Sequence, residues 1–407
     1  MKVAAIISEY NPLHNGHKLH IDKTKKELNC DYLISIMSGN FVQRGLPSYI
    51  DKWNKSKVCV SNGIDLVIEL PVIFSLSSAE FFAKGSAQIL NSLGIVDYLS
   101  FGSEVGDIEP LKLIASILCN EPHAYKSLLK YNLSYGLAFA KARSLALTEY
   151  ITNNFPMYTI DFITNLLSSS NNILAIEYLK ALYSLDSTIE PFTIKRLGSN
   201  YNDEGLSASF SSATSIRNHL KTSDDLTLLK SHLPKSSYTL IETLIKDNYT
   251  FPQMENIFPF IKYKALTDNN SLKQIPEASE GLYNKIYKSL WDSSTYEESF
   301  SKMKSKRYAS TRINRLLCQY FIGFEKYSID NLRRSDPSYI RVLAFNNKGA
   351  ELLKKIKSTS SLQIYTKLPK SLCPMLELDL QSTKAYSILN PSIRYNEDYF
   401  KSPIIIK

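Results

Sequence analysis

The sequence contains no apolar run of about 18 residues, the length that a membrane-spanning helix requires. Its first apolar stretch is interrupted at Glu9, so we expect neither a spanning helix nor a secretory signal peptide. Cysteine is scarce and dispersed, and no two cysteines form a C-x-x-C pair; the five are Cys30, Cys59, Cys119, Cys318 and Cys373. This usage predicts a cytoplasmic protein with buried structural thiols and without a metal cluster.

Histidine is also scarce, but its distribution is uneven. Six histidines occur in 407 residues, and three of them lie between positions 14 and 20. An apolar stretch ends at Ser8-Glu9, an Asn11-Pro12 turn follows, and His14-Asn15-Gly16-His17 opens a segment of helical periodicity. A strand, a glycine-containing turn and a helix N-terminus together form an anion site, because free N–H groups and the helix dipole face the phosphate. The alternative is that the histidines are exposed first-turn residues of an ordinary helix.

A second candidate phosphate site lies at residues 211–217. The segment Ser211-Ser212-Ala213-Thr214-Ser215-Ile216-Arg217 gathers hydroxyl groups at a helix N-terminus and puts an arginine one turn further on. Hydroxyls and free N–H groups can donate to a triphosphate while the guanidinium neutralises its charge. The alternative is an N-cap followed by a surface arginine.

The order of strand-like and helical segments predicts the fold. Apolar strand-like runs at 4–8, 31–38, 65–71, 97–102 and 193–196 alternate with helical stretches such as 79–93 and 171–183. This alternation favours an α/β fold with a Rossmann-like, doubly wound parallel sheet, in which ligands bind at the C-terminal ends of the strands. From about residue 222 the pattern becomes mostly helical. We therefore expect a catalytic domain at 1–221 and a mostly α-helical, basic region at 222–407.

Further polar candidates lie at or near strand ends. The loop 37–45 contains two glycines and Arg44, Gly102 follows the fourth strand, Asn171 begins a helix, and Arg196 ends the fifth strand. Glycine lets a ligand approach the backbone closely, and the polar side chains could contact a nucleotide. Each of these features has an ordinary alternative, a strand-to-helix turn for the glycines and an N-cap for the residues around Asn171.

Positive charge is concentrated in one segment. The net charge is +9, but residues 301–370 contain 16 Lys and Arg against four acids, which is +12 and leaves −3 for the rest. A basic block confined to one region is typical of a protein that binds a polyanion such as RNA. The alternative is a solvated basic face without a partner.

The motif pair at His14–His17 and Ser212–Arg217 resembles the HxGH nucleotidylyltransferase superfamily, with Ala213 in place of a serine. Segments 8–17, 37–45, 65–71, 171–174 and 308–315 extend the resemblance to the bacterial tRNA(Met) cytidine acetate ligases. The sequence departs from that pattern at Ser170, Asn202 and Lys55, where the family usually has proline, histidine and arginine.

The resemblance implies a carbon–nitrogen ligase that uses ATP. Acetate attacks the α-phosphate of ATP to give acetyl-adenylate and pyrophosphate, and N4 of the wobble cytidine of elongator tRNA(Met) then takes the acetyl group. The implied partners are this tRNA, acetate and ATP with Mg²⁺, without a membrane or DNA. His14, His17, Thr214 and Arg217 are the implied catalytic residues.

The resemblance also implies two sets of binding residues. The nucleotide would be held by Ile7, Ser8, Glu9, Tyr10, Asn11, Pro12, Leu13, His14, Asn15, Gly16, His17, Lys18, Leu19, His20, Gly102, Asn171 and Arg196. The tRNA would be held by Lys306, Arg307, Arg312, Arg315 and Arg341, with Tyr308 and Phe345 stacking on unpaired bases. Two other functions remain open at this stage: a nucleotidylyltransferase for a small phosphorylated metabolite, and a non-catalytic RNA-binding protein.

Overall fold

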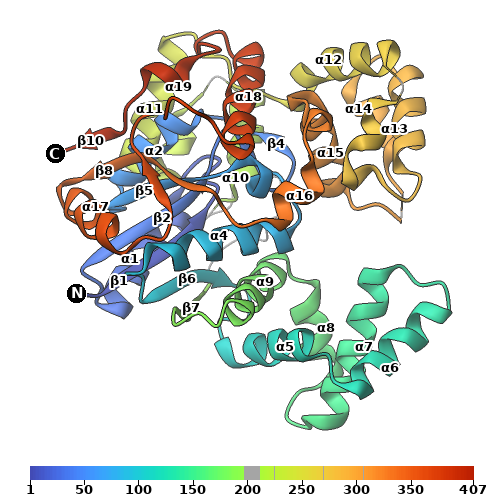
Figure 1. The fold of residues 1–407 in the computed structure, drawn as a ribbon. Helices are drawn as coiled ribbons and strands as arrows, with labels where there is room; N and C mark the ends of the chain where they lie inside the picture. Colours follow the sequence, from blue (N-terminus) through green and yellow to red (C-terminus); the bar gives the residue numbers. More distant parts are fainter. Residues whose placement is uncertain (197–210, 224, 269, 306) are drawn as a thin grey trace. The chain divides into compact units, whose positions relative to one another are not determined.

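The computed structural model describes residues 1–196, 211–223, 225–268, 270–305 and 307–407 (Figure 1). The chain forms two compact units. Unit 1 comprises Met1–Val96 and Leu197–Lys407, and unit 2 comprises Asp97–Arg196. These units differ from the predicted regions, which are 1–221 and 222–407. The assignment of catalysis to the first region and of RNA binding to the second stays a prediction.

Unit 1 is built on a mainly parallel sheet with strand order β10-β8-β5-β2-β1. Strands β1 (Val3–Ser8), β2 (Tyr32–Ser38) and β5 (Leu66–Leu70) run parallel, with Ile6 opposite Ser35 and Ile36 opposite Ile68. Most of their apolar side chains are buried, as expected for strands covered on both faces. The α/β fold and these three strands confirm the sequence prediction.

The C-terminal segment completes the sheet of unit 1. Strand β8 (Tyr339–Asn346) pairs antiparallel with β5, and both β10 (Ile404–Ile406) and β9 (Gln363–Tyr365) pair parallel with β8. The periodicity of 339–345 and 362–365 predicted strands there. It did not predict that they join the N-terminal sheet, because pairing partners far apart in sequence leave no local signal.

Helices cover this sheet and form a further cluster, α12–α15, in which neighbouring helices pack together (Figure 1). The helices of unit 1 are α1 (Asn15–Leu28), α2 (Lys52–Ser61), α3 (Val72–Ser75), α4 (Ala79–Leu93), α10 (Ala213–Thr222), α11 (Lys235–Lys246), α12 (Met254–Thr267), α13 (Leu282–Trp291), α14 (Tyr296–Met303), α15 (Ser310–Ile322), α16 (Ile329–Arg334), α17 (Asn347–Thr359), α18 (Pro374–Leu389) and α19 (Glu397–Phe400). Short 3₁₀ turns are η1 (Thr227–Ser231), η2 (Ser271–Gln274), η3 (Pro276–Ala278) and η4 (Phe324–Lys326), and a small hairpin pairs β3 (Phe41–Val42) with β4 (Leu46–Pro47).

Unit 2 contains two parallel strands and five helices within Asp97–Arg196. Strand β6 (Tyr98–Ser103) pairs with β7 (Glu190–Lys195), so that Gly102 lies opposite Ile194. The helices are α5 (Ile108–Asn120), α6 (His123–Ser134), α7 (Phe139–Asn154), α8 (Ile160–Ser168) and α9 (Ser170–Ser184). Helix α5 packs on α9, and α6 packs on α7.

A buried ionic cluster joins α2, β5, β8 and α19. Lys52 Nζ lies 2.8 Å from Glu69 Oε1 and 3.0 Å from Asp398 Oδ1, and Arg341 Nη2 lies 3.1 Å from Asp398 Oδ1. All four side chains are at most 4% exposed. Burial alone raises the pKa of Asp398, but Arg341 and Lys52 outweigh it and lower this pKa to about 2. The cluster therefore holds the C-terminal segment on the sheet in charged form.

Two other sequence predictions concern exposure. Cys59 and Cys318 are buried, whereas Cys119 is exposed and Cys30 and Cys373 are partly exposed, so the prediction of buried thiols holds for only two of the five cysteines. Within the described ranges, no helix is both long and apolar enough to cross a membrane.

Candidate nucleotide-binding site

The two histidines of the HxGH motif cap the N-terminus of α1. His14 Nδ1 accepts a hydrogen bond from the Gly16 amide at 3.1 Å, and His17 Nδ1 accepts one from the His14 amide at 3.3 Å. Their ring centroids lie 3.7 Å apart. Since each Nδ1 is an acceptor, a neutral ring carries its proton on Nε2, which is then a hydrogen-bond donor. The turn thus presents two imidazole donors at the positive end of a helix.

Gly16 is required by the position of the His14 ring. A Cβ atom at residue 16 would lie 2.9 Å from His14 Cε1 and 3.1 Å from His14 Nδ1. A larger residue would push the ring away and break the bond to the Gly16 amide. Gly16 therefore leaves the space that the His14 ring needs to cap the helix.

The second motif lies directly beside the first. Ser212 caps α10 by accepting from the Ser215 amide at 3.0 Å. Arg217, one turn into α10, donates to the backbone oxygen of Asn11 at 2.6 Å and to Thr214 Oγ1 at 3.1 Å. The structure therefore brings the two predicted phosphate motifs together, although they are about two hundred residues apart, and it links the N-terminal ends of α1 and α10.

His232 provides a second connection between these motifs. Its backbone oxygen accepts from the Asn15 amide at 3.0 Å, and its Nδ1 pairs with Ser211 Oγ at 3.1 Å. Burial lowers the pKa of His232, with a smaller contribution from His219. No local signal marks His232 in the sequence, because it lies outside both motifs.

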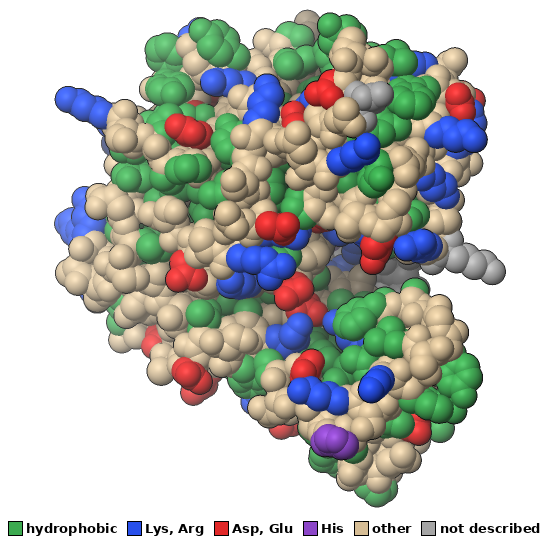
Figure 2. Space-filling view, turned by 45° about the vertical axis from the view of Figure 1, so that its right-hand side comes forward, with side chains coloured by type: hydrophobic (Ala, Val, Ile, Leu, Met, Phe, Trp, Pro, Cys, Tyr) green, Lys and Arg blue, Asp and Glu red, His purple; other side chains and the backbone are tan. Residues whose placement is uncertain are grey.

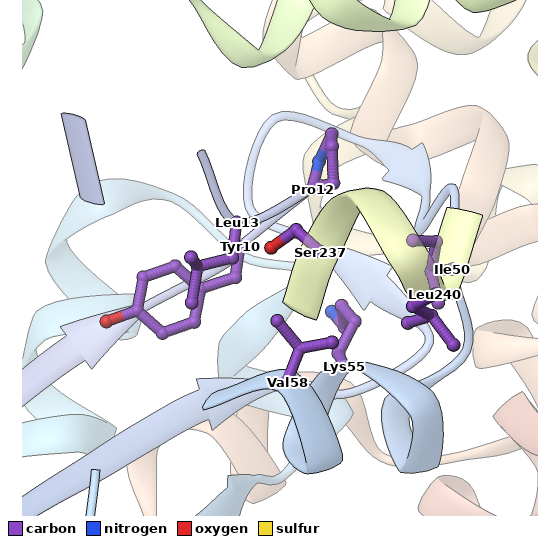
Figure 3. A pocket seen from close by; sticks show the side chains of 8 residues that line it. All are labelled: Tyr10, Pro12, Leu13, Ile50, Lys55, Val58, Ser237 and Leu240. Atoms are coloured by element: carbon purple, nitrogen blue, oxygen red, sulfur yellow. The ribbon is translucent and has the colours of Figure 1, made fainter. Parts of the chain in front are cut away.

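Lys55, whose side chain is drawn in Figure 3, fixes the backbone at the ends of two strands of the sheet. Its ammonium group, on a side chain that is 3% exposed, donates to the backbone oxygens of Glu9, Ser38 and Gly39 at 2.9–3.1 Å. These oxygens lie at the C-terminal ends of β1 and β2. Burial lowers the pKa of Lys55 to about 8. In the sequence, Lys55 is marked only as a departure from the family pattern, and its burial on α2 is known only from the structure.

A small hollow lies next to Lys55, between the HxGH loop, α2 and α11 (Figure 3). It is lined by Tyr10, Pro12, Leu13, Ile50, Lys55, Val58, Ser237 and Leu240, and its volume of about 10 Å³ has room for roughly one water molecule. A nucleotide does not fit there. The donors of His14, His17 and α10 are instead the features of this unit that suit a phosphate chain.

The glycine-containing loop 37–45 has a packing role. A Cβ at Gly45, whose φ is +78°, would lie 2.1 Å from the backbone nitrogen of Arg315. A Cβ at Gly39 would lie 2.6 Å from Glu69 Oε1. At these two glycines the close neighbours are therefore α15 and Glu69. This corrects the expectation that a ligand lies against the backbone there.

Three predicted nucleotide contacts lie together in unit 2. The Arg196 side chain covers Gly102, where a Cβ would meet Arg196 Cγ at 3.1 Å, and Arg196 Nη1 lies 3.5 Å from Asn171 Oδ1. Asn171 Nδ2 donates to Glu104 Oε1 at 2.6 Å, and the other carboxylate oxygen of Glu104 accepts from the Asn172 amide. Glu104, which is not among the residues predicted from the sequence, therefore caps α9 and orients Asn171.

Two predicted tRNA contacts are corrected by burial. Arg315 is 7% exposed and pairs with Glu277 at 3.2 Å, and Arg341 is 3% exposed within the buried ionic cluster. A guanidinium enclosed in this way and paired with a carboxylate cannot reach a phosphate on the surface. These two residues stabilise the fold instead.

The other predicted tRNA contacts differ in their surroundings. Arg312 donates to Glu280 at 2.8 Å and to Ser279, whereas Arg307 is exposed and lies over the Tyr308 ring. Tyr308 is 8% exposed and donates to the Glu280 backbone oxygen, which corrects its predicted stacking on a base. Lys306 and Asn202 lie outside the described residues.

Comparisons with known proteins agree with this arrangement of motifs. The sequence matches the family described as HIGH Nucleotidyl Transferase over residues 1–399. It is 53% identical over 407 residues to a tRNA(Met) cytidine acetate ligase of Clostridium botulinum (strain Okra / Type B1), covering 100% of this chain and 99% of the relative. The chain belongs to the tRNA(Met) cytidine acetate ligase family of HIGH nucleotidyl transferases. A ligase of the same name from Clostridium novyi (strain NT) is 50% identical over 408 residues and is covered completely.

Solved structures support the same assignment to this family. The apo form of Thermotoga maritima TmcAL has a TM-score of 0.93 and 31% identity, with 100% of both chains covered. The form of that protein bound with alpha-thio ATP has a TM-score of 0.90 and 32% identity, covering 100% of this chain and 99% of the other. The HIGH nucleotidyltransferase fold expected from the sequence is therefore confirmed.

Proposed function

We propose that this chain uses ATP and acetate to acetylate N4 of the wobble cytidine of elongator tRNA(Met). An acetate oxygen attacks the α-phosphorus of ATP, and the bond to the β-phosphate oxygen breaks, which yields acetyl-adenylate and pyrophosphate. The cytidine amine then attacks the acetyl carbonyl carbon, loses a proton, and releases AMP. Full-length similarity to enzymes named tRNA(Met) cytidine acetate ligase supports this activity.

The observation that carries the proposal is the link between the two helix N-termini. The bond of 2.6 Å between Arg217 and Asn11 holds α10 beside the turn that begins α1. Two helix N-termini, two imidazole donors and one guanidinium can then face one polyphosphate. The first step joins two anions, so such a site acts mainly by orienting them and by stabilising the negative charge that develops on pyrophosphate.

Within this site we assign each catalytic residue a distinct role. His14 and His17 donate through Nε2 to phosphate oxygens of ATP, and Thr214 donates through its hydroxyl. Arg217 neutralises charge on the leaving pyrophosphate, while its Nη1 donates to the Asn11 backbone oxygen and keeps that loop in place. The remaining residues of the loop Ile7–His20, together with Gly102, Asn171 and Arg196, are proposed nucleotide contacts.

We further propose that Mg²⁺ enters with ATP. The described residues contain no group of three His, Cys, Asp or Glu side chains that could hold a metal ion. Mg²⁺ commonly keeps several water ligands and binds substrate phosphates, which fits an ion that arrives bound to the nucleotide. The ion would neutralise phosphate charge there.

Pyrophosphate release from ATP tests the proposed function. It is measured with purified protein, with and without acetate and with and without tRNA(Met), and labelled acetate is followed into the tRNA. Acetate-dependent release with label in the tRNA is the expected result. Release that ignores acetate but requires a phosphorylated metabolite would favour a simple nucleotidylyltransferase, and no release under any condition would favour a non-catalytic RNA-binding protein.

The pKa of Lys55 predicts an alkaline limit to the first step. Above pH about 8 the side chain becomes a neutral amine with two N–H donors, so one of its three backbone acceptors loses its bond. We expect the rate of acetate-dependent ATP–pyrophosphate exchange to fall as the pH rises through this range. In Lys55→Arg the group stays charged, and the fall should move to higher pH by at least about one unit.

The comparison requires that both proteins remain folded at each pH, which circular dichroism establishes. If the two exchange profiles coincide, the alkaline limit belongs to another group. A wild-type rate that is constant up to pH about 9.5 would contradict the assignment to Lys55 altogether.

A further inference from the structure

The hairpin of α6 and α7 in unit 2, residues 123–154, has an unusual charge pattern. Residues 123–154 contain four cations, Lys126, Lys130, Lys141 and Arg143, and one acid, Glu149 on α7. The rest of the chain outside residues 301–370 has a net charge of −3. The hairpin is therefore a local basic segment that the total charge conceals.

Two of these four cations are available to a partner. Lys126 lies 3.1 Å from Glu121, and Arg143 lies 3.7 Å from the buried Glu177. Lys130 and Lys141 are exposed, and the structure gives neither of them an ion pair with any described residue. Both lie near the connection between α6 and α7.

Aromatic side chains are exposed around the same connection. Tyr131 is 59% exposed, Tyr135 is 67% exposed and Phe139 is 59% exposed. The rings of Tyr131 and Tyr135, four residues apart, meet edge to face at 5.0 Å, and their hydroxyls form a hydrogen bond of 2.9 Å. Figure 2 shows hydrophobic areas with lysine and arginine side chains, and a few acidic ones, between them over the helices that Figure 1 labels α6 to α8.

These rings do not serve the packing of the hairpin. The inner face already buries Tyr125, which is 1% exposed, together with Ala146, Leu147 and Ile151. Aromatic residues that are exposed next to unpaired lysines do not add to the stability of the unit. Such exposed apolar surface is typical of a binding site. The chemistry that fits is a polyanion with exposed planar groups.

We propose that the α6–α7 hairpin binds an unpaired loop of the RNA substrate, an inference that rests on the proposed function. Tyr131, Tyr135 and Phe139 stack on unpaired bases, and Lys130 and Lys141 contact the backbone phosphates on either side. A second copy of this chain is the less favourable occupant. Self-association through a twofold axis would bring this basic face against itself, with four cations and one acid, Glu149, in residues 123–154 of each copy.

Helix α12 offers a matched comparison. Its Tyr263 is 70% exposed, close to the exposure of Tyr135, but residues 254–304 contain seven lysines and seven acids. An exposed tyrosine in neutral surroundings lacks the charge that attracts RNA. Tyr263→Ala therefore controls for the loss of an exposed ring, and Lys112→Glu, on α5 of the same unit, controls for the change of charge.

The test measures the Kd of tRNA(Met) and of its isolated anticodon stem–loop by fluorescence anisotropy at several salt concentrations. We expect Tyr135→Ala to raise both Kd values about tenfold, since loss of a stacked base has an effect of that order. Lys130→Glu should raise Kd and reduce the slope of log Kd against log salt by about one. Tyr263→Ala and Lys112→Glu should change each Kd by less than about twofold.

Two readouts separate this proposal from the proposed function. Acetate-dependent ATP–pyrophosphate exchange without tRNA should be unchanged in all four variants, so absent exchange in the wild type would contradict the enzyme and not the RNA surface. Unchanged RNA affinity in Tyr135→Ala and Lys130→Glu would overturn the hairpin proposal. A wild-type dimer in sedimentation that dissociates in Tyr135→Ala, with RNA affinity retained, would assign the face to a second copy.

Discussion

Replacing His17 with alanine is expected to lower acetate-dependent ATP–pyrophosphate exchange by about 100-fold or more. The change removes a preorganised donor at the N-terminus of α1, and the loss of one such donor at a developing anion typically has this magnitude. It also removes the acceptor for the His14 amide. The measurement is the exchange rate at saturating ATP and acetate, together with the Kd of tRNA(Met), which should stay within about tenfold.

A second substitution separates the two roles of His17. In His17→Asn the side-chain oxygen can accept from the His14 amide as Nδ1 does, but no group reaches the position of Nε2. We expect this variant to have wild-type thermal stability and the same loss of exchange as His17→Ala. Recovery of exchange in His17→Asn would show that His17 only caps the helix, and loss of tRNA binding in both variants would indicate misfolding.

The parts of the fold and site that sequence predicted are those with a local signal. A strand of apolar residues, the turn at Asn11-Pro12 and the helix start at His14 are each determined by neighbouring residues, and the structure contains β1 and α1 there. The helix at 79–93 was also predictable, and the structure ends it at Gly94 with φ of +68°. The approach of Arg217 to Asn11 was predictable only through the combination of two motifs.

The errors concern charges and glycines whose partners are distant in sequence. Counting lysines and arginines between 301 and 370 suggested a surface for RNA, but Arg341 pairs with Glu69 and Asp398 from other elements. The paired glycines of the loop 37–45 suggested a ligand, and Gly45 is instead approached by the backbone of α15. Packing between segments distant in sequence determines the partners of Arg341 and of Gly45, and this packing cannot be inferred from composition.

The basic residues of the α6–α7 hairpin were missed for a related reason. Four cations against one acid are a weak signal in a chain of net charge +9. Their meaning depends on exposure, because Lys130 and Lys141 are exposed while Arg143 pairs with a buried glutamate. The aromatic residues beside them could equally have been core residues of an amphipathic helix until the structure placed them on the surface.

The buried ionic cluster leads to the largest expected effect on stability. Arg341→Met should lower the free energy of unfolding by about 3–5 kcal/mol, because it leaves Asp398 and Glu69 enclosed with Lys52 as their remaining cation. Chemical denaturation followed by circular dichroism measures this change. Arg307→Met, at an exposed position in the same basic segment, should change the free energy by less than about 0.5 kcal/mol.

The double variant Arg341→Met/Asp398→Asn tests the electrostatic reason. Removing one acid with the arginine leaves Lys52 and Glu69 as a balanced pair at 2.8 Å, so part of the lost stability should return. If the double variant is no more stable than Arg341→Met, the loss comes from packing and not from an uncompensated charge. If Arg341→Met instead keeps its full stability but loses affinity for tRNA(Met), the Arg341 guanidinium contacts RNA. In that case its ion pairs with Glu69 and Asp398 are not what stabilises the fold.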